Sequence, residues 1–104
     1  MKQQIFVTGA AGFVGRHLVK ILVNEKYDIT SLVKVENEKK LIPPGSNIII
    51  GDLSKKGKWQ DSLKEHHTLI HLASIVSAKD SRDFKKNNII ATKNLVEAAK
   101  KVKI

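Results

Sequence analysis

The feature that most constrains the fold is a glycine-punctuated stretch near the N-terminus, residues 5–19. It opens with Ile5-Phe6-Val7, an apolar run of β-branched and aromatic residues that predicts a buried strand. Gly9, Gly12 and Gly15 follow, and helical periodicity begins behind them. A helix leaves its first backbone N–H groups unpaired, and its dipole places partial positive charge there. Strand, glycine turn and helix in this order therefore predict a cradle for a phosphate group.

The helix behind the glycines is predicted from about Gly12 to Glu25. We expect the missing side chains of Gly9 and Gly12 to leave room for a pyrophosphate, and Gly15 to let the helix lie close to the strand. A plain strand-to-helix turn is the alternative, since glycines also make ordinary turns. Five apolar side chains are spaced so that they can share one face of this helix: Phe13, Val14, Leu18, Ile21 and Leu22.

The rest of the chain alternates short apolar runs with helical patterns, which predicts βαβ units and a parallel sheet. Further helices are expected at Trp59–His66 and Asp83–Lys101, and Glu36–Ser46 forms at most one or two helical turns before Pro43-Pro44-Gly45 redirects the chain. Strands are predicted at Gln4–Thr8, Tyr27–Val33, Asn47–Ile50 and Thr68–Ala73.

Two of these helices carry apolar patterns. Trp59 and Leu63 lie four residues apart, so they share one helical face and are predicted to pack inward. The last helix carries an apolar stripe made of Ile89, Leu95, Val96 and Ala99.

Composition restricts the function classes. At 104 residues the chain is at most one small domain, and without cysteine it has neither disulfides nor thiolate chemistry. The net charge of +9 raises the question of nucleic acid, but the lysines are dispersed and only 5% of residues are aromatic, so we favour a solvated lysine-rich surface. His66, His67 and His71 lack partners with ligand spacing, so no metal is expected. No apolar run is long enough for a membrane span, and no signal peptide is seen; we expect a soluble cytoplasmic protein.

The stretch Thr8–Gly15, with sequence TGAAGFVG, resembles the cofactor fingerprint of the extended short-chain dehydrogenase/reductase family, which includes NAD(P)-dependent epimerases, dehydratases and reductases. Gly51–Leu53, His71–Ser74 and Asn88–Leu95 fit the same family in order. The resemblance implies an α/β fold, a partial Rossmann doubly wound parallel sheet of about four strands in the order 3-2-1-4 with flanking helices. It covers the whole chain, yet only the N-terminal part of such a protein. Residues 1–104 are therefore expected to be an NAD(P)-binding Rossmann domain that is incomplete at its C-terminal side.

The end of the second strand bears on which cofactor is bound. Cofactors without a 2′-phosphate are usually held there by an acidic residue about 20 residues beyond the glycines. Aligned through the resemblance, that place falls on Val33, followed by Lys34, and no carboxylate comes before Glu36. A cation favours the extra phosphate, so NADP is favoured over NAD. The alternatives are that Lys34 is a solvated loop lysine and that Glu36 reaches the ribose.

Two later places are implied to contact the cofactor. In the family, the residues matching Asp52 and Leu53 contact the adenine ring, while a helix cap by Asp52 or Ser54 is the alternative. The backbone at Ala73-Ser74 borders the ribose and pyrophosphate in the family, although Ala73 can also be small merely for helix packing.

Asn88 matches a family asparagine that bonds the backbone near the nicotinamide, and an ordinary surface amide is the alternative. The complete set of expected cofactor contacts is Gly9, Gly12, Phe13, Val14, Gly15, Lys34, Asp52, Leu53, Leu72, Ala73, Ser74 and Asn88.

The catalytic group of the family, a Tyr-x-x-x-Lys pair, is not found in this sequence. The only tyrosine, Tyr27, is followed four residues later by Ser31. We therefore expect no catalytic residue here and no turnover by this chain alone. The hypotheses are a cofactor-binding part of an NAD(P)-dependent enzyme acting on a nucleotide sugar or another hydroxyl or carbonyl substrate, and a non-catalytic dinucleotide-binding or partner-subunit module. The free edge of the fourth strand predicts a homo-oligomer formed through this strand; a domain-swapped assembly and a marginally stable monomer are the alternatives.

Overall fold

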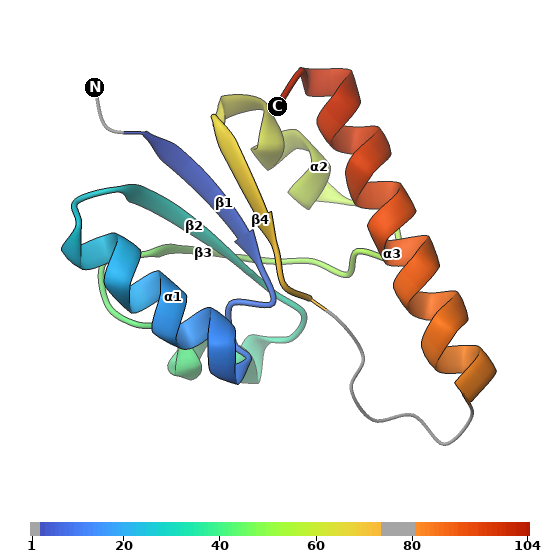
Figure 1. Cartoon of the computed structure of the whole chain (residues 1–104), viewed down its shortest axis with the longest axis horizontal. Coiled ribbons are helices and arrows are strands. Elements are labelled where there is room, and N and C mark those ends of the chain that lie inside the picture. Colours follow the sequence, from blue (N-terminus) through green and yellow to red (C-terminus); the bar gives the residue numbers. More distant parts are fainter. Residues whose placement is uncertain (1–2, 74–80) are drawn as a thin grey trace.

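The fold is a four-stranded parallel sheet with helices on both faces (Figure 1). The computed structural model describes residues 3–73 and 81–104. The strands lie in the order β3-β2-β1-β4, so the predicted α/β class and the predicted order 3-2-1-4 are confirmed. The strands are β1 (Gln4–Thr8), β2 (Asp28–Val33), β3 (Asn47–Ile50) and β4 (Thr68–His71). The helices are α1 (Phe13–Asn24), α2 (Lys58–Ser62) and α3 (Ser81–Val102), with 3₁₀ turns η1 (Glu36–Leu41) and η2 (Leu63–Glu65).

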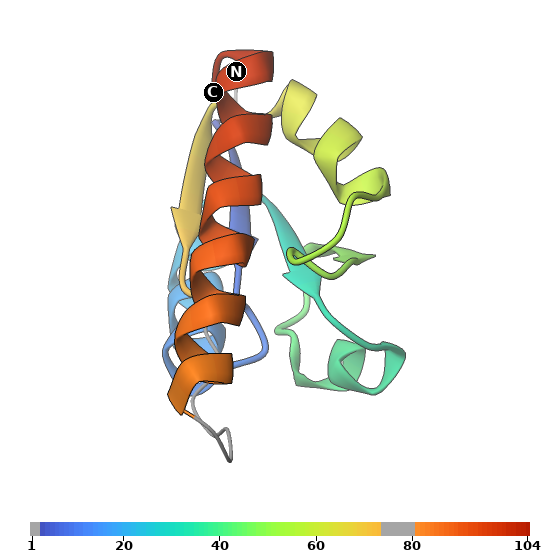
Figure 2. The same ribbon diagram turned by 90° about the vertical axis from the view of Figure 1, so that its right-hand side faces the viewer.

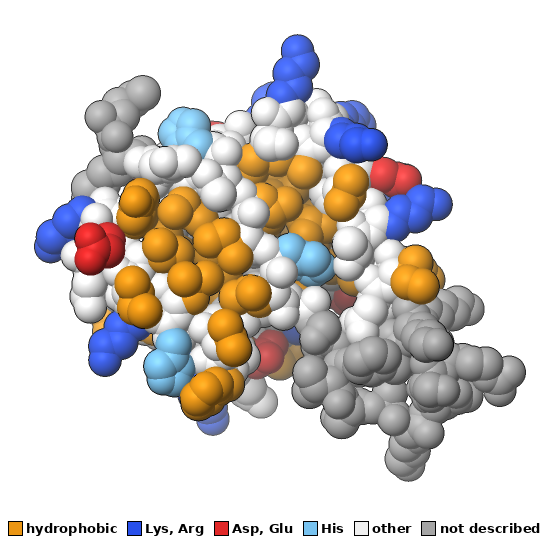
Figure 3. All heavy atoms as spheres, in the orientation of Figure 1, with side chains coloured by type: hydrophobic (Ala, Val, Ile, Leu, Met, Phe, Trp, Pro, Cys, Tyr) orange, Lys and Arg blue, Asp and Glu red, His pale blue; other side chains and the backbone are white. Residues whose placement is uncertain are grey.

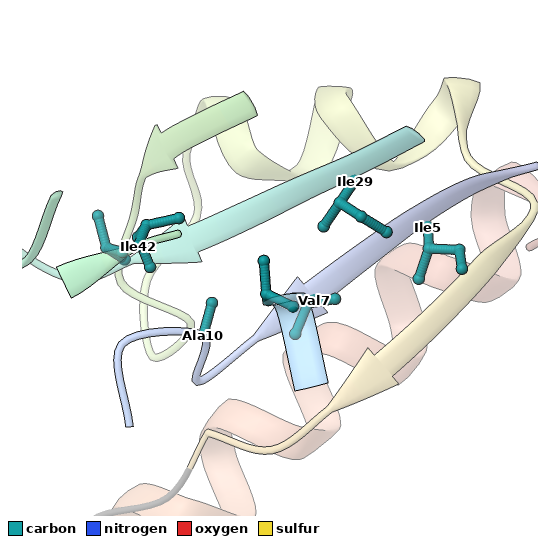
Figure 4. Packing of buried hydrophobic residues seen from close by; sticks show 7 residues of the cluster. Ile5, Val7, Ala10, Ile29 and Ile42 are labelled. Carbon is teal, nitrogen blue, oxygen red and sulfur yellow. The ribbon is translucent and has the colours of Figure 1, made fainter. Parts of the chain in front are cut away.

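One core lies between α1 and the sheet. Alternate residues of a strand point to opposite faces, so Ile5 and Val7 of β1 share this face with Ile29 of β2. Val19 of α1 packs on them, and the cluster also includes Val33 of β2 together with Ala10 and Ile42 from the connecting segments. Figure 4 shows Ile5, Val7, Ala10, Ile29 and Ile42 gathered against the strands.

A second core lies on the opposite face, where α2 and α3 pack; Figure 2 shows α1 and α2 on opposite sides of the sheet. Phe6 of β1 lies here beside the fully buried side chains of Trp59 and Leu63. Their predicted inward packing is therefore confirmed. The indole N–H of Trp59 donates to the carbonyl oxygen of Lys55 at 3.0 Å, which satisfies the buried polar group.

The five apolar residues spaced along one face of α1 do not all point to the sheet, although Leu22 packs against the first core. Phe13 is 72% exposed and Ile21 is 58% exposed, and Val14 is exposed as well. The side that packs on the sheet carries Gly15 and Val19 instead. The glycine has no side chain, so it brings its own side of the helix closest to the strand, and the apolar residues on the other side turn outward.

Two residues of the apolar stripe on α3 are buried and two are exposed. Leu95 is 1% exposed and Ala99 is buried, whereas Ile89 is exposed and Val96 is 45% exposed. The core side of the helix includes Ala98, so small side chains supply contacts that a count of large ones misses.

Replacing Leu95 with alanine is expected to lower the free energy of unfolding by about 2–5 kcal/mol, because it leaves a cavity in the second core. Val96→Ala is the matched control on the same helix, and we expect it to change stability by less than about 0.5 kcal/mol. Urea unfolding followed by Trp59 fluorescence measures both. Equal losses in the two variants would contradict this packing.

Smaller differences concern boundaries. The strand β2 begins at Asp28 rather than Tyr27, which follows Lys26 with a positive φ of 70° and is partly exposed. The strand β4 ends at His71 rather than Ala73. The predicted helix over Trp59–His66 is split into α2 and the tighter turn η2.

The edge strand β4 pairs with β1 and with no other strand of the described residues. Hydrophobic side chains gather over α1 and beside β4 on this side of the molecule (Figure 3). Self-association through the β4 edge stays a prediction, which sedimentation at rising concentration would reveal as a rising average mass. Within residues 3–73 and 81–104, no helix has the length and hydropathy needed to cross a bilayer.

Candidate functional site

A cleft of about 680 Å³ opens where the strands end at their carboxyl side. This is the edge at which open α/β sheets bind ligands, and the volume is that of ordinary small-molecule sites. Every expected cofactor residue that the structure describes lines it, and Ser74 lies outside the described residues. The residues of the expected set that line the cleft are Gly9, Gly12, Phe13, Val14, Gly15, Lys34, Asp52, Leu53, Leu72, Ala73 and Asn88.

The start of α1 presents bare backbone donors to this cleft. Gly12 is the N-cap, and its own N–H donates to the Gly9 carbonyl oxygen at 3.1 Å. The next three N–H groups, those of Phe13, Val14 and Gly15, have no acceptor among the described residues. No side chain caps the helix and its first turn carries no acid, so the positive end of the dipole stays uncompensated by this part of the chain.

The three glycines have different roles. A Cβ on Gly9 would lie 2.6 Å from the nitrogen of Ala73 and 2.6 Å from the carbonyl carbon of Leu72, and Gly9 has a φ of +69°. Gly9 therefore makes room for protein backbone, which corrects the expectation that its missing side chain makes room for a pyrophosphate. A Cβ on Gly15 would overlap the Gly9 carbonyl oxygen, as expected for a helix lying close to the turn. Only at Gly12 is the space nearly open, with the Gly9 oxygen at 3.3 Å.

Two opposite charges line the cleft beyond the end of β2, Lys34 directly after the strand and Glu38 in η1. One oxygen of Glu38 accepts the N–H groups of Lys34 at 2.9 Å and of Val35 at 3.2 Å. Glu36, which the sequence offered as the alternative ribose contact, pairs with Lys39 at 3.2 Å instead. Sequence reasoning missed Glu38, although its place three residues after Val35 is the position from which an acid commonly reaches back to the chain entering a helical turn.

The turn after β3 is shaped by Asp52. Its carboxylate accepts the N–H of Ser54 at 2.9 Å and the Ser54 hydroxyl at 2.7 Å. The hydroxyl bond holds the pKa of Asp52 below its ordinary value; burial opposes this shift, and the charges of Lys34 and Lys55 add to it. The N-cap of α2 is Gly57, which has no side-chain cap, so the proposed helix cap by Asp52 or Ser54 is not found.

The helix α3 fixes the same turn from the other side. The amide nitrogen of Asn94 donates to the carbonyl oxygen of Leu53 at 2.9 Å. Asn88, one helical turn and a half earlier, lines the cleft. Sequence reasoning gave Asn94 no role, because its partner is 41 residues away along the chain.

The histidines considered as metal ligands bond protein groups. His66 lies between the Ser62 carbonyl oxygen at 2.6 Å and the Thr30 hydroxyl at 2.9 Å. Nδ1 of His67 accepts the N–H of Gln4 at 3.0 Å. Across the described ranges, no three His, Cys, Asp or Glu side chains lie close enough to hold a metal ion.

Known proteins match this arrangement. A family model described as the NAD dependent epimerase/dehydratase family matches residues 5–104. The chain is 29% identical over 101 residues to 4-hydroxy-2-methyl-3-oxo-4-farnesyl-3,4-dihydroquinoline-1-oxide ketoreductase of Stigmatella aurantiaca, covering 95% of this chain and 30% of the relative. It is 29% identical over 119 residues to bifunctional UDP-glucose 4-epimerase and UDP-xylose 4-epimerase 3 of Arabidopsis thaliana, covering 97% and 34%.

A solved structure agrees in fold. A crystal structure of UDP-glucose 4-epimerase superposes with a TM-score of 0.85 at 25% identity, covering 98% of this chain and 33% of that one. The chain thus spans about a third of the length of the relatives it matches. With the family model matching nearly all of it, the chain belongs to the NAD dependent epimerase/dehydratase family.

Proposed function

We propose that this chain is the dinucleotide-binding part of an NAD(P)-dependent epimerase, dehydratase or reductase, with residues 1–104 forming an incomplete Rossmann domain. The observation that carries the proposal is the cleft at the ends of the strands, with the open amides of Phe13, Val14 and Gly15 at its base. Such amides suit a diphosphate, because they donate hydrogen bonds where the helix dipole is positive.

In this proposal each wall of the cleft holds one part of the cofactor. The diphosphate lies against the start of α1, and the adenine lies beside Asp52 and Leu53, whose turn is held by Asn94. Ala73 and Asn88 border the nicotinamide side. When bound, the nicotinamide ring supplies hydride transfer. The residues of this chain bind and orient the dinucleotide, and the substrate is proposed to be a nucleotide sugar or another hydroxyl or carbonyl compound.

The proposed cofactor is NADP, since Lys34 lies at the cleft where the 2′-phosphate would bind. Glu38 is the group that favours NAD, because its second oxygen can accept a ribose hydroxyl. One oxygen of Glu38 is already engaged by the backbone N–H groups of Lys34 and Val35, which partly offsets its charge.

Replacing Lys34 with alanine is expected to weaken NADP binding by about tenfold, the effect of losing one hydrogen bond to a charged group. NAD binding should change little, because NAD has no 2′-phosphate. Calorimetric titration of each cofactor into each protein measures the four affinities. Glu38→Gln is the matched variant of opposite sign, and we expect it to strengthen NADP binding. A wild-type chain that binds NAD more tightly than NADP would overturn the cofactor assignment.

A non-catalytic dinucleotide-binding or partner-subunit module is the second candidate, since the cleft and the open amides of α1 suit it equally well. Both candidates require nucleotide binding, so a titration in which neither NADP nor NAD binds would contradict both. The DNA that follows the codon for Ile104 separates them. A reading frame that continues through a Tyr-x-x-x-Lys pair supports the enzyme, whereas a stop codon supports the module.

A further inference from the structure

The hydroxyl of Thr8 joins three segments at the end of β1. Its oxygen lies 3.1 Å from the backbone nitrogen of Leu72 and 3.2 Å from that of Ala73. It also lies 2.6 Å from Nδ1 of His71. The other ring nitrogen of His71, Nε2, lies 3.1 Å from the Thr92 hydroxyl on α3. Hydrogen bonds between side chains thus link the end of β1, next to the glycine turn, to His71 of β4 and Thr92 of α3.

The Thr8 hydroxyl has only one proton, which fixes the donor and the acceptor in each of these hydrogen bonds. A hydroxyl oxygen has two acceptor sites and one proton to donate. Both N–H groups, from Leu72 and Ala73, can only donate, so they occupy the two acceptor sites, although the Leu72 N–H is also shared with the Thr8 carbonyl oxygen at 3.2 Å. The Thr8 proton therefore goes to Nδ1 of His71. A neutral ring that accepts at Nδ1 carries its hydrogen on Nε2, which donates to Thr92.

We propose that His71, as the neutral Nε2–H tautomer, is a positioning residue for dinucleotide binding that acts through Thr8. The inference rests on the proposed function. Leu72 and Ala73 line the cleft, and their peptide lies so close to Gly9 that no Cβ would fit between them. The Thr8 hydroxyl accepts the N–H of Leu72 and the N–H of Ala73, so it holds two successive peptide groups of this segment, and His71 orients the hydroxyl. This relay of hydrogen bonds, from Thr92 through His71 to Thr8, thereby sets the position of the Leu72-Ala73 backbone relative to the glycine turn.

Protonation of His71 disrupts this arrangement. A proton on Nδ1 would face the Thr8 proton, so the hydroxyl would have to rotate and release one of the two N–H groups of Leu72 and Ala73. Burial lowers the pKa of His71 from its ordinary 6.5, which keeps the ring neutral at neutral pH. Hence the Leu72-Ala73 backbone keeps both hydrogen bonds at neutral pH. Dinucleotide affinity should fall as the pH drops below 6.5 and passes the lowered pKa of His71 in the folded protein.

Among the side chains that the structure describes, the charged groups near His71 do not supply a competing explanation for its lowered pKa. The paired strand β1 carries no titratable side chain in Gln4–Thr8. Along the described part of α3, the charged residues next to Thr92 are Lys93 and, a turn later, Glu97. Burial, not a neighbouring charge, is the cause of the lowered pKa.

The tautomer is tested directly by a long-range ¹H–¹⁵N spectrum of the imidazole groups in the full chain at pH 7.5. We expect His71 to show a protonated Nε2 and a bare Nδ1. A ring protonated at Nδ1, alone or together with Nε2, would overturn the relay. This result does not depend on whether the chain binds a nucleotide, so it separates failure of the relay from failure of the proposed function.

The positioning role is tested by NAD titrations between pH 7.5 and pH 5. NAD is the probe because the 2′-phosphate of NADP itself titrates near pH 6. His71→Asn offers an acceptor near the place of Nδ1 but does not titrate. We expect the affinity ratio of wild type to His71→Asn to fall with pH, approaching tenfold per pH unit once His71 is charged. Taking the ratio removes the effect of the other histidines on affinity, because they are the same in both proteins. A ratio that stays constant would overturn the role.

Variants of Thr8 keep the test independent of how well His71→Asn folds. Thr8→Ser retains the hydroxyl and is expected to keep the pH dependence of the wild type. Thr8→Val has nearly the same shape without the hydroxyl, so it should bind NAD more weakly and lose the dependence on His71. Equal pH profiles for these two variants would overturn the inference. Absence of NAD binding by the wild type at every pH would overturn the proposed function, and the positioning role with it.

Discussion

Replacing Gly15 with alanine is expected to lower the free energy of unfolding by about 3 kcal/mol. The added Cβ would overlap the Gly9 carbonyl oxygen and would lie 2.8 Å from the Cα of Ala10, and both are backbone atoms that cannot rotate away. Within a helix, glycine to alanine normally stabilises by up to about 1 kcal/mol, so the sign of the change is itself diagnostic. Urea unfolding followed by the fluorescence of the buried Trp59 measures it.

Gly12→Ala is the matched control for this experiment. Its Cβ would meet only the Gly9 oxygen, at 3.3 Å, and its backbone at φ −75° and ψ 171° suits any residue. We expect this variant to unfold at nearly the urea concentration of the wild type. If Gly15→Ala proved as stable as Gly12→Ala, α1 would not lie against the turn as described.

Gly12→Val is expected to weaken dinucleotide binding by about a hundredfold while the fold stays intact. The side chain would stand in open space at the cleft, next to the N–H groups of Phe13, Val14 and Gly15. Keeping a diphosphate from one or two such charge-assisted bonds costs about 2.7 kcal/mol, which is about a hundredfold in affinity. An extended backbone accepts a β-branched residue, so stability should change little.

Calorimetric titration compares Gly12→Val with Gly12→Ala and the wild type, and unfolding curves verify the fold of each. We expect the alanine variant to lie between the other two. Wild-type affinity in Gly12→Val would mean that the diphosphate binds elsewhere.

Periodicity and glycine spacing in the sequence predict the layout of this fold. Successive residues of a strand point to opposite faces, so the apolar run Ile5-Phe6-Val7 supplies side chains to both faces of the sheet. The structure has one core on each face. The turn after β1 and the ends of the other strands meet at one cleft because parallel strands end at the same edge. The family resemblance extended this to Asp52, Ala73 and Asn88, which line the same cleft.

What the sequence could not predict depends on contacts between distant residues. Periodicity gives the spacing of apolar residues along a helix but not which side packs on the sheet, so it could not show that Val19 would be buried and Ile21 exposed. The role of Gly9 is set by the backbone of Leu72 and Ala73, more than 60 residues away, whose N–H groups donate to the neighbouring Thr8 hydroxyl. Polar partners such as Asn94 and the Leu53 carbonyl oxygen carry no local signal at all.

The central claim is that a dinucleotide places its diphosphate against the open amides at the start of α1. The most direct test is an amide ¹H–¹⁵N spectrum of the labelled chain recorded as NADP is added to saturation. We expect the resonances of Phe13, Val14 and Gly15 to shift most, because their N–H groups gain charged acceptors. Saturable binding that leaves these three resonances in place would contradict it.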